Sequence, residues 1–278
     1  MSIVPPTKKN ENTDVAGKTA PCLLNPETRN VNDVSAFPMI SAGNPPQPGM
    51  DFASGTVWLI NKPAKWTSFR VVGLLRKLTG VKKVGHAGTL DPLATGLLVV
   101  CTGRATKAIT NLIGADKRYE CDIRLGESTP SYDSETPPDA KSPCNHVTEE
   151  QIRQVIKNYF SGPVLQIPPM YSAIKHKGQP LYKYARKGEE ISRPAREVTL
   201  YETRLTGFRN GIVSLDIHCS KGTYIRTIAD DLGKKLGTLG TLVALRRTAI
   251  GTFRSDDALE VETILSKLDP DGNYTISR

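Results

Sequence analysis

The sequence predicts an α+β fold with a mixed, largely antiparallel β-sheet flanked by helices. Strand-like and helix-like segments follow one another without the regular alternation that a parallel βαβ architecture requires. The dipeptide Asn210-Gly211 separates two long strand-like runs, and Asn-Gly in that position is the strongest short signal of a β-hairpin. With 278 residues, the chain is long enough to bury a substantial hydrophobic core.

In the first half of the chain, order is expected from Thr56 onwards. Residues 56–60 (TVWLI) predict a strand by their β-branched and aromatic content. Thr67 or Ser68 caps a helix that ends at Gly80, because apolar residues recur between them at helical spacing. Further elements are predicted in this order: a strand at 97–101, a short helix at 106–113 and an alternating strand at 117–125.

In the second half, Thr148 and Gln151 predict a capping box, and the apolar stripe of the helix that follows ends before Pro163. Two strands at residues 197–208 and 212–219 flank the Asn-Gly turn. The remaining elements are predicted in this order: a helix that ends at Gly237, a strand at 242–247 and a short helix at 261–268.

Two regions depart from this pattern. Residues 1–53 are rich in Pro, Asn, Thr and Ser and lack periodicity, which predicts a disordered N-terminal extension. Residues 54–278 are expected to form one domain with an insertion at about 126–196. Residues 164–196 mix tyrosines with many bases, a composition that suits RNA through stacking and phosphate contacts. A solvated basic loop whose tyrosines belong to the core is the alternative.

The charge of the chain indicates a polyanionic partner. The formal net charge is +9, and the first fifty residues contribute four bases and four acids, so the excess lies in the folded part. A basic domain favours nucleic acid first and an anionic membrane second. A generically basic surface is the alternative reading.

Composition also limits the compartment and the chemistry. The five cysteines are scattered without metal-binding or disulfide spacing, which indicates a reducing compartment and no metal site. No apolar run approaches the length of a membrane span, and the N-terminus lacks the core of a signal peptide. We therefore expect a cytoplasmic protein, with organelles and the nucleus left open, and no membrane partner.

The loop at residues 84–100 (VGHAGTLDPLATGLLVV) contains the strongest candidate for a reactive group, Asp91. Pro92 biases Asp91 away from α-helix, and the glycines of the loop allow a close approach of backbone. Taken alone, the Asp-Pro pair could simply cap a turn. His86 could act as a base, stack on a ring or be an ordinary loop histidine.

Other candidates lie far away in sequence. Arg226 is a candidate partner for a buried carboxylate, because a guanidinium is permanently charged and can keep Asp91 ionised. Tyr119 and Tyr224 offer faces on which a base could stack. Spacing alone does not join Asp91, Tyr119 and Arg226 into one site.

Six motifs, in the same order along residues 56–255, resemble those of TruB-type tRNA pseudouridine synthases. They are 59–63 (LINKP) with 66–69 (WTSF), 85–96 (GHAGTLDPLATG), 116–119 (DKRY), 167–173 (IPPMYSA) with 181–188 (LYKYARKG), 219–226 (CSKGTYIR), and 245–248 (LRRT). The resemblance implies a pseudouridine synthase fold whose catalytic domain spans residues 54–278. It also implies isomerisation of uridine in RNA, at position 55 of the tRNA T loop, without a metal or organic cofactor.

By the same resemblance, Asp91 is the nucleophile or the carboxylate that stabilises the ribose, and Arg226 pairs with it. Tyr119 stacks on the base and helps to remove the C5 proton. The other implied roles are these: His86 fills the space of the flipped nucleotide, Leu245 lines the pocket, Lys62 and Pro63 brace the loop, and Tyr224, Tyr171 and Lys175 contact the substrate.

The resemblance also sets expectations about partners. The chain is expected to bind the T arm of tRNA as a monomer, without an obligatory protein partner, and to lack the C-terminal RNA-binding domain of many family members. Two rival readings keep the same fold: a non-catalytic RNA-binding or chaperone module, and a guide-RNA-dependent synthase of the dyskerin kind. A generic basic scaffold protein is a third reading, against which the six ordered motifs argue.

Overall fold

A mixed sheet of eleven strands organises the computed structural model, which describes residues 33–274. Its main strands lie in the order β1-β2-β4-β13-β5-β12-β11-β8, and β3, β14 and β15 join at its sides. Only the pairs β1–β2, β4–β13 and β2–β15 are parallel among the described strands, so the predicted α+β class with a largely antiparallel sheet is confirmed.

The strands of this sheet have the following bounds: β1 Met39–Ile40, β2 Val57–Lys62, β3 Val84–His86, β4 Thr95–Thr102, β5 Lys117–Leu125, β8 Gly162–Gln166, β11 Arg196–Arg209, β12 Ile212–Cys219, β13 Gly240–Ile250, β14 Phe253–Arg254 and β15 Leu259–Glu260. Two small hairpins stand apart: β6 Glu127–Ser128 with β7 Ala140–Lys141, and β9 Lys175–His176 with β10 Gln179–Pro180. The turn between β11 and β12 has positive φ at Asn210 (51°) and Gly211 (72°), as the Asn-Gly signal requires.

The α-helices are α1 Ser68–Thr79, α2 Ile109–Gly114, α3 Glu149–Tyr159, α4 Leu181–Ala185, α5 Ile225–Lys235 and α6 Val261–Leu268. Short 3-10 turns lie at Val34–Ala36, Gly103–Ala108 and Ser255–Asp257. The predicted caps are present: Thr67 accepts from the backbone of Arg70, Gly80 ends α1 with φ 68°, and Thr148 and Gln151 form a capping box on α3.

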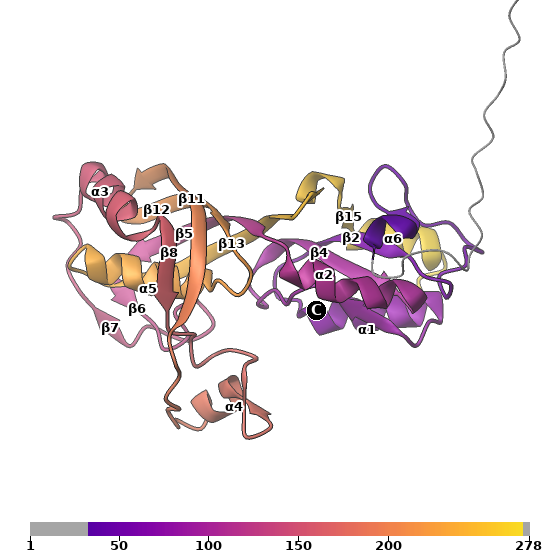
Figure 1. Cartoon of the computed structure of the whole chain (residues 1–278), viewed down its shortest axis with the longest axis horizontal. Coiled ribbons are helices and arrows are strands. Elements are labelled where there is room, and N and C mark those ends of the chain that lie inside the picture. Colours follow the sequence, from indigo (N-terminus) through magenta and orange to yellow (C-terminus); the bar gives the residue numbers. More distant parts are fainter. Residues whose placement is uncertain (1–32, 275–278) are drawn as a thin grey trace, which may run out of the picture. The chain divides into compact units, whose positions relative to one another are not determined.

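Strand β13 lies between β4 and β5 (Figure 1). It links one half of the sheet, formed by β1, β2 and β4, with the other half, formed by β5, β12, β11 and β8. Its Arg246 and Arg247 pair in parallel with the start of β4, and most of its length pairs antiparallel with β5. Helix α5 packs against β13 and β5, while α6 packs against β2 and β15. The junction of β4, β13 and β5 therefore brings segments together that are more than a hundred residues apart in the chain.

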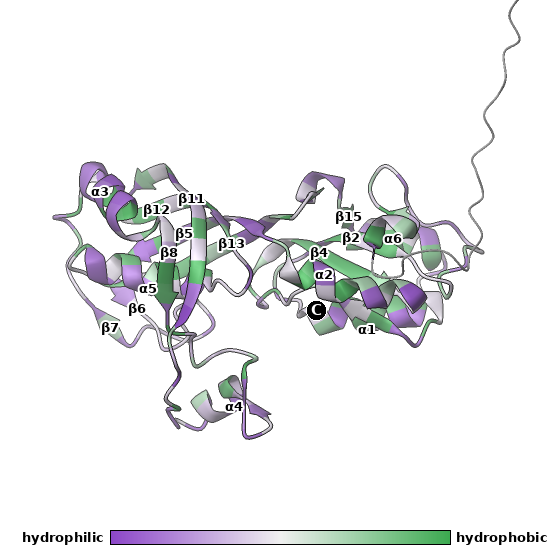
Figure 2. Cartoon of the chain, in the orientation of Figure 1, coloured by the Kyte–Doolittle hydropathy of each residue, from purple (hydrophilic) through white to green (hydrophobic). Residues whose placement is uncertain are grey.

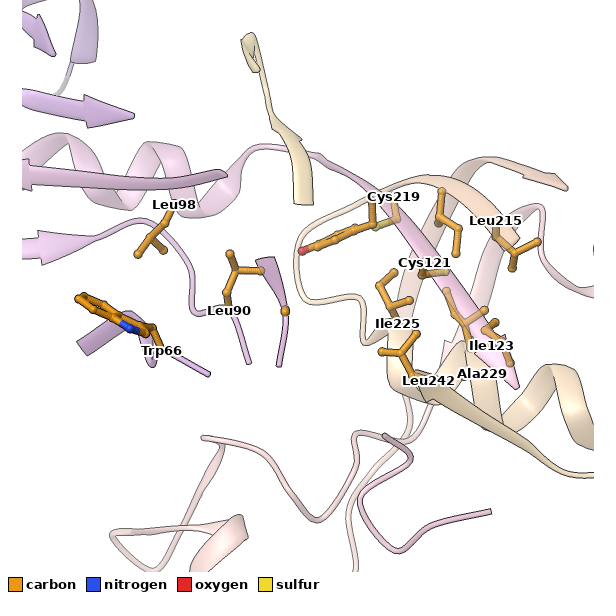
Figure 3. Packing of buried hydrophobic residues seen from close by; sticks show 14 of the residues in the cluster. Trp66, Leu90, Leu98, Cys121, Ile123, Leu215, Cys219, Ile225, Ala229 and Leu242 are labelled. Atoms are coloured by element: carbon orange, nitrogen blue, oxygen red, sulfur yellow. The ribbon is translucent and has the colours of Figure 1, made fainter. Parts of the chain in front are cut away.

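Buried apolar side chains fill both halves. Strand β4 is apolar along nearly its whole length, which Figure 2 shows as a green strand, and Leu97 to Cys101 are 0% exposed. Leu90, the residue before Asp91, lies beside Trp66 and Leu98 on one side of the close-up in Figure 3. The core residues of β5, β12 and α5 lie on the other side, so the loop that carries Asp91 is anchored in packed side chains.

The prediction that residues 1–53 are disordered is wrong for residues 33–53. Strand β1 pairs with β2 there, and Phe37, Ile40 and Phe52 are buried. Three apolar side chains spread over sixteen residues leave no helical or strand period, so the local pattern hides the packing. Residues 1–32 lie outside the described part of the chain. Other differences are small: the helix expected at 106–113 is a 3-10 turn followed by α2, and β13 is longer at both ends than 242–247.

Candidate active site

The loop between β3 and β4 holds Asp91 in a conformation that depends on glycine. Gly88 and Gly96 have φ values of 95° and 97°, which L side chains rarely adopt. A Cβ atom on Gly96 would lie 2.3 Å from the carbonyl oxygen of Arg247, so β4 could not pair with β13 there. The backbone of Ala94 donates to the carbonyl oxygen of Asp91 at 3.1 Å and closes the turn over Pro92.

Asp91 and Arg226 lie in direct contact, although 135 residues separate them in the chain. Arg226 Nη2 donates to Asp91 Oδ1 at 3.1 Å, and Arg226 Nε lies 2.9 Å from Oδ2. The side chain of Arg226 is 4% exposed and that of Asp91 is 34% exposed, so the carboxylate forms the open end of the pair. Arg226 Nη1 also donates to the carbonyl oxygens of Tyr171 (2.8 Å) and Ser131 (3.2 Å), which fixes its orientation.

A second carboxylate, Asp133, approaches the same Nε atom of Arg226 as Asp91 does, and the sequence analysis did not identify it. Asp133 Oδ2 is 3.6 Å from Arg226 Nε, and the residue is 5% exposed. Its Oδ1 accepts from the Ser131 hydroxyl (2.7 Å) and from the backbone of Glu135 (2.9 Å). No motif spacing marks Asp133; its Ser- and Thr-rich loop looked like an ordinary insertion.

Burial raises the pKa of Asp91 above its ordinary value, and the Arg226 guanidinium opposes this rise. Asp133 and Glu135 raise the pKa of Asp91 further, because like charges disfavour ionisation. Asp91 is thus a carboxylate that is poorly solvated and has one free side. Such a group is more reactive towards an electrophilic carbon than a fully hydrated carboxylate.

Two tyrosines lie close enough to Asp91 for its charge to raise the pKa of each. Tyr119 on β5 is 9% exposed and pairs in register with Arg247 on β13. Burial raises the pKa of Tyr119, and the charge of Arg247 and a side-chain hydrogen bond from it work in the opposite direction. Tyr224 precedes α5, and Gln166 holds its backbone N–H at 3.0 Å; burial raises its pKa as well.

Two buried cations support the loop that carries Asp91 through hydrogen bonds to backbone carbonyl oxygens. Lys62 Nζ donates to the carbonyl oxygens of Trp66 (2.7 Å), Pro63 (2.9 Å) and Pro92 (3.3 Å), and burial lowers the pKa of Lys62 to about 8. Arg247, 1% exposed, donates to the carbonyl oxygens of Leu97 (2.8 Å), Gly88 (3.1 Å) and Thr89 (3.4 Å). The sequence analysis included Arg247 in a motif but gave it no role.

A pocket opens beside the Asp91 carboxylate. It is lined by these residues: Asp91, Leu93, Ala94, Asp133, Leu242, Val243, Ala244 and Leu245. Leu245 is one of these lining residues. Burial and the charge of Arg247 lower the pKa of His86, so its imidazole is neutral at pH 7.

The basic segment 164–196 also lies near the site. Tyr171 contributes its backbone carbonyl to Arg226, and Arg186 pairs with Glu135 at 3.0 Å. Lys175 lies on β9 and is exposed. Within residues 33–274, no group of His, Cys, Asp or Glu could hold a metal ion, and no helix is long and apolar enough to cross a membrane.

Comparisons with known proteins agree with this arrangement. The model of the TruB family pseudouridylate synthase N-terminal domain matches residues 76–225. The model of the tRNA pseudouridylate synthase B C-terminal domain matches residues 226–271. The matched segment covers α5, β13 and α6. The sequence analysis expected an appended C-terminal RNA-binding domain to be absent, and this match does not test that expectation.

Two relatives named tRNA pseudouridine synthase B share 45% identity with the chain. The protein of Coxiella burnetii (strain Dugway 5J108-111) aligns over 79% of this chain and 70% of its own length. The protein of Parabacteroides distasonis aligns over 77% of this chain and 94% of its own. Among solved structures, a Cbf5–Nop10–Gar1 complex contains a chain with 26% identity and a TM-score of 0.61. The alignment covers 88% of this chain and 59% of that chain.

Proposed function

Because the chain belongs to the TruB family of pseudouridylate synthases, we propose that it isomerises uridine to pseudouridine in RNA. The proposed substrate is the uridine at position 55 in the T loop of tRNA. The single observation that carries the proposal is the contact between Asp91 and Arg226 at the edge of an open pocket, with Tyr119 close by. That arrangement supplies a reactive carboxylate, a fixed counter-charge and an aromatic face.

In the proposed reaction, the N1–C1′ bond of the target uridine breaks and a C5–C1′ bond forms in its place. Asp91 either bonds to the ribose or stabilises its positive charge while the free uracil turns. The proton on C5 then leaves, and N1 gains a proton, so atoms and charge balance. Tyr119 stacks on the uracil and assists removal of the C5 proton, and Leu245 packs against the base.

Arg226 opposes the rise in the pKa of Asp91 that burial causes and so favours the ionised carboxylate. Lys62 and Arg247 hold the backbone of the loop, and Asp133 is a second carboxylate near Arg226 Nε. Positioning of this kind matters because a displacement of 1 Å can reduce a rate about a hundredfold.

Access to the pocket requires the target base to leave its stack, at a cost of a few kcal/mol. His86, neutral at pH 7, takes the place of the flipped nucleotide. Residues of the insertion, including Lys175 and those around Tyr171, contact RNA phosphates and so offset this cost. Tyr224 contacts the substrate at the start of α5. Binding to tRNA is therefore expected to weaken steeply with salt.

We further propose that the enzyme acts as a monomer without an obligatory protein partner or cofactor, and that residues 33–278, rather than 54–278, form the catalytic unit. A guide-RNA-dependent enzyme is the second candidate, because Cbf5 in the solved complex is accompanied by Nop10 and Gar1. A cytoplasmic location stays a prediction.

One experiment separates these candidates. Purified protein alone is mixed with an unmodified tRNA transcript carrying [5-³H]uridine, and tritium release and the position of pseudouridine are measured. Conversion of the T-loop uridine, absent from a transcript with cytidine at that position, supports the proposal. Binding without conversion would instead favour a partner-dependent enzyme or a non-catalytic RNA-binding protein.

A further inference from the structure

Phe69 is a large aromatic side chain that the fold leaves in solvent. It is 73% exposed, whereas Phe37 and Phe52 are both below 9%. It lies in the first turn of α1, directly after the helix residue Ser68, which is buried. The proposed reaction at the Asp91 pocket gives Phe69 no role, so its exposure needs another explanation.

The position of Phe69 is tied to the loop that carries Asp91. Ser68 Oγ accepts from the backbone N–H of Leu90 at 2.9 Å and lies 3.2 Å from the Leu90 carbonyl oxygen. Leu90 is the residue before Asp91, so the start of α1 is fixed to the site. The rings of Phe69 and His86 meet edge to face, with centroids 5.6 Å apart and planes at 90°. Phe69 therefore stands next to the residue expected to enter the RNA.

The surroundings favour a single flat ligand over a protein surface. Its neighbours in the chain, the exposed Thr67 and the half-buried Arg70, are polar, whereas a protein-binding surface is usually a broad apolar patch. The chain carries a net charge of +9, which attracts nucleic acid. Unpaired bases of RNA loops are commonly bound by stacking on aromatic side chains.

We propose that Phe69 is a stacking platform for an unpaired nucleobase of the substrate RNA, next to the nucleotide that enters the Asp91 pocket. This inference rests on the proposed function, because it takes the RNA to lie across the Asp91 loop. The ring of Phe69 holds the RNA loop beside His86 while the target base is flipped out of its stack. It acts on binding of the RNA and not on the bond changes at the uridine.

The test compares four variants, Phe69→Ala, Phe69→Leu, Phe69→Tyr and Phe69→Trp, in binding to a fluorescently labelled, unmodified tRNA transcript. Tyr159→Ala is the matched control, because Tyr159 is also an exposed aromatic residue (48%) but lies at the end of α3. Thermal unfolding of each variant is recorded. Since Phe69 is mostly exposed, its replacement is expected to leave the unfolding temperature unchanged.

Stacking predicts that Phe69→Ala and Phe69→Leu weaken tRNA binding about fivefold or more, since the loss of one stacked base has an effect of this size. Phe69→Tyr and Phe69→Trp keep the aromatic face and bind within about twofold of the wild type. The tryptophan of Phe69→Trp is quenched when the transcript is added, against a background of Trp58 and Trp66, which are buried.

Wild-type affinity in Phe69→Leu would overturn the proposal, because it would reduce Phe69 to an apolar support for His86. Wild-type affinity in Phe69→Ala, or an unquenched Phe69→Trp, would overturn it as well. Tritium release from the same transcript separates the two proposals. A wild type that binds without converting uridine contradicts the proposed function, while weak binding of Phe69→Ala still supports the stacking platform.

Discussion

Arg247 on β13 donates a hydrogen bond from Nη2 to the carbonyl oxygen of Gly88 at 3.1 Å, three residues before Asp91. Two further bonds to Leu97 and Thr89 complete its contacts with the loop. The same guanidinium interacts with the Tyr119 hydroxyl. One buried cation thus fixes both the backbone of the loop that carries Asp91 and the side chain of Tyr119.

Arg247→Lys is therefore expected to lower the single-turnover rate of pseudouridine formation about a hundredfold, because one amine cannot hold several carbonyls and the loop shifts. The affinity for tRNA should change little, since Arg247 is buried. Rates and affinities are measured separately on the tRNA transcript. Arg246→Lys is the control, because the side chain of Arg246 bonds to Asn61, outside the loop. Equal losses in both variants would contradict this role.

Asp133→Asn keeps the shape of the side chain and removes its charge. We expect a rate about ten- to a hundredfold lower at pH 8, because Arg226 loses a charged partner. Asp133 raises the pKa of Asp91, so its neutralisation should also move the acid limb of the rate profile to lower pH.

The pH profile of Asp133→Asn is measured from pH 5 to 8 under single-turnover conditions. Asp139→Asn is the control, because Asp139 lies in the same loop but bonds to Ser128 and is exposed. An acid limb that moves to higher pH, or an unchanged rate, would show that Asp133 does not act through Arg226 and Asp91.

The burial of Lys62 can be tested through the pH dependence of the free energy of unfolding. Its pKa in the folded chain is about 8, below the 10.5 of the unfolded chain. Between these values the unfolded state binds more protons, so the folded state gains stability as the pH rises. Wild type should therefore become more stable relative to Lys62→Met from about pH 8 to 10.5, and not below pH 8.

Urea unfolding of both proteins at pH 7, 8, 9 and 10 gives this difference. Burial also lowers the pKa of Lys117 to about 8, but Lys117 is present in both proteins and its contribution cancels. A difference that is constant across this range would mean that Lys62 is not desolvated as the structure indicates.

The N-terminal segment makes a further prediction. Ile40 of β1 is 0% exposed and belongs to the core, so Ile40→Ala is expected to lower the free energy of unfolding by about 2–5 kcal/mol. The unfolding temperature should fall by several degrees. Gln47→Ala, at an exposed position of the same segment, should leave it unchanged. If both variants unfold like the wild type, the segment does not pack on β2.

Local patterns were sufficient where the signal lies within one element. The β11–β12 turn followed from Asn210-Gly211, and α6 follows the predicted residues 261–268. The pairing of Asp91 with Arg226 was an informed candidate, because a buried carboxylate needs a cation. The distance between Asp91 and Arg226 is set by the junction of β4, β13 and β5, which no short stretch of the sequence describes.

The residues that were missed make contacts that no periodic pattern of the sequence marks. Arg247 binds carbonyl groups, which any sequence supplies, and Asp133 is placed by hydrogen bonds within an irregular loop. Ile40 and its neighbours are buried by a strand of two residues. Tertiary contacts decide the positions of Arg247 and Ile40, whereas local bonds in an irregular loop decide that of Asp133.

The most direct test of the central claim is the single-turnover conversion of the T-loop uridine by Asp91→Asn, compared with the wild type and with Asp122→Asn, an acid on β5 that bonds to Ser214. Wild-type and Asp122→Asn are expected to form pseudouridine at similar rates. Asp91→Asn is expected to form none while binding the transcript with similar affinity. Pseudouridine formation by Asp91→Asn at the wild-type rate would contradict the account, because the carboxylate beside Arg226 would then not take part in the reaction.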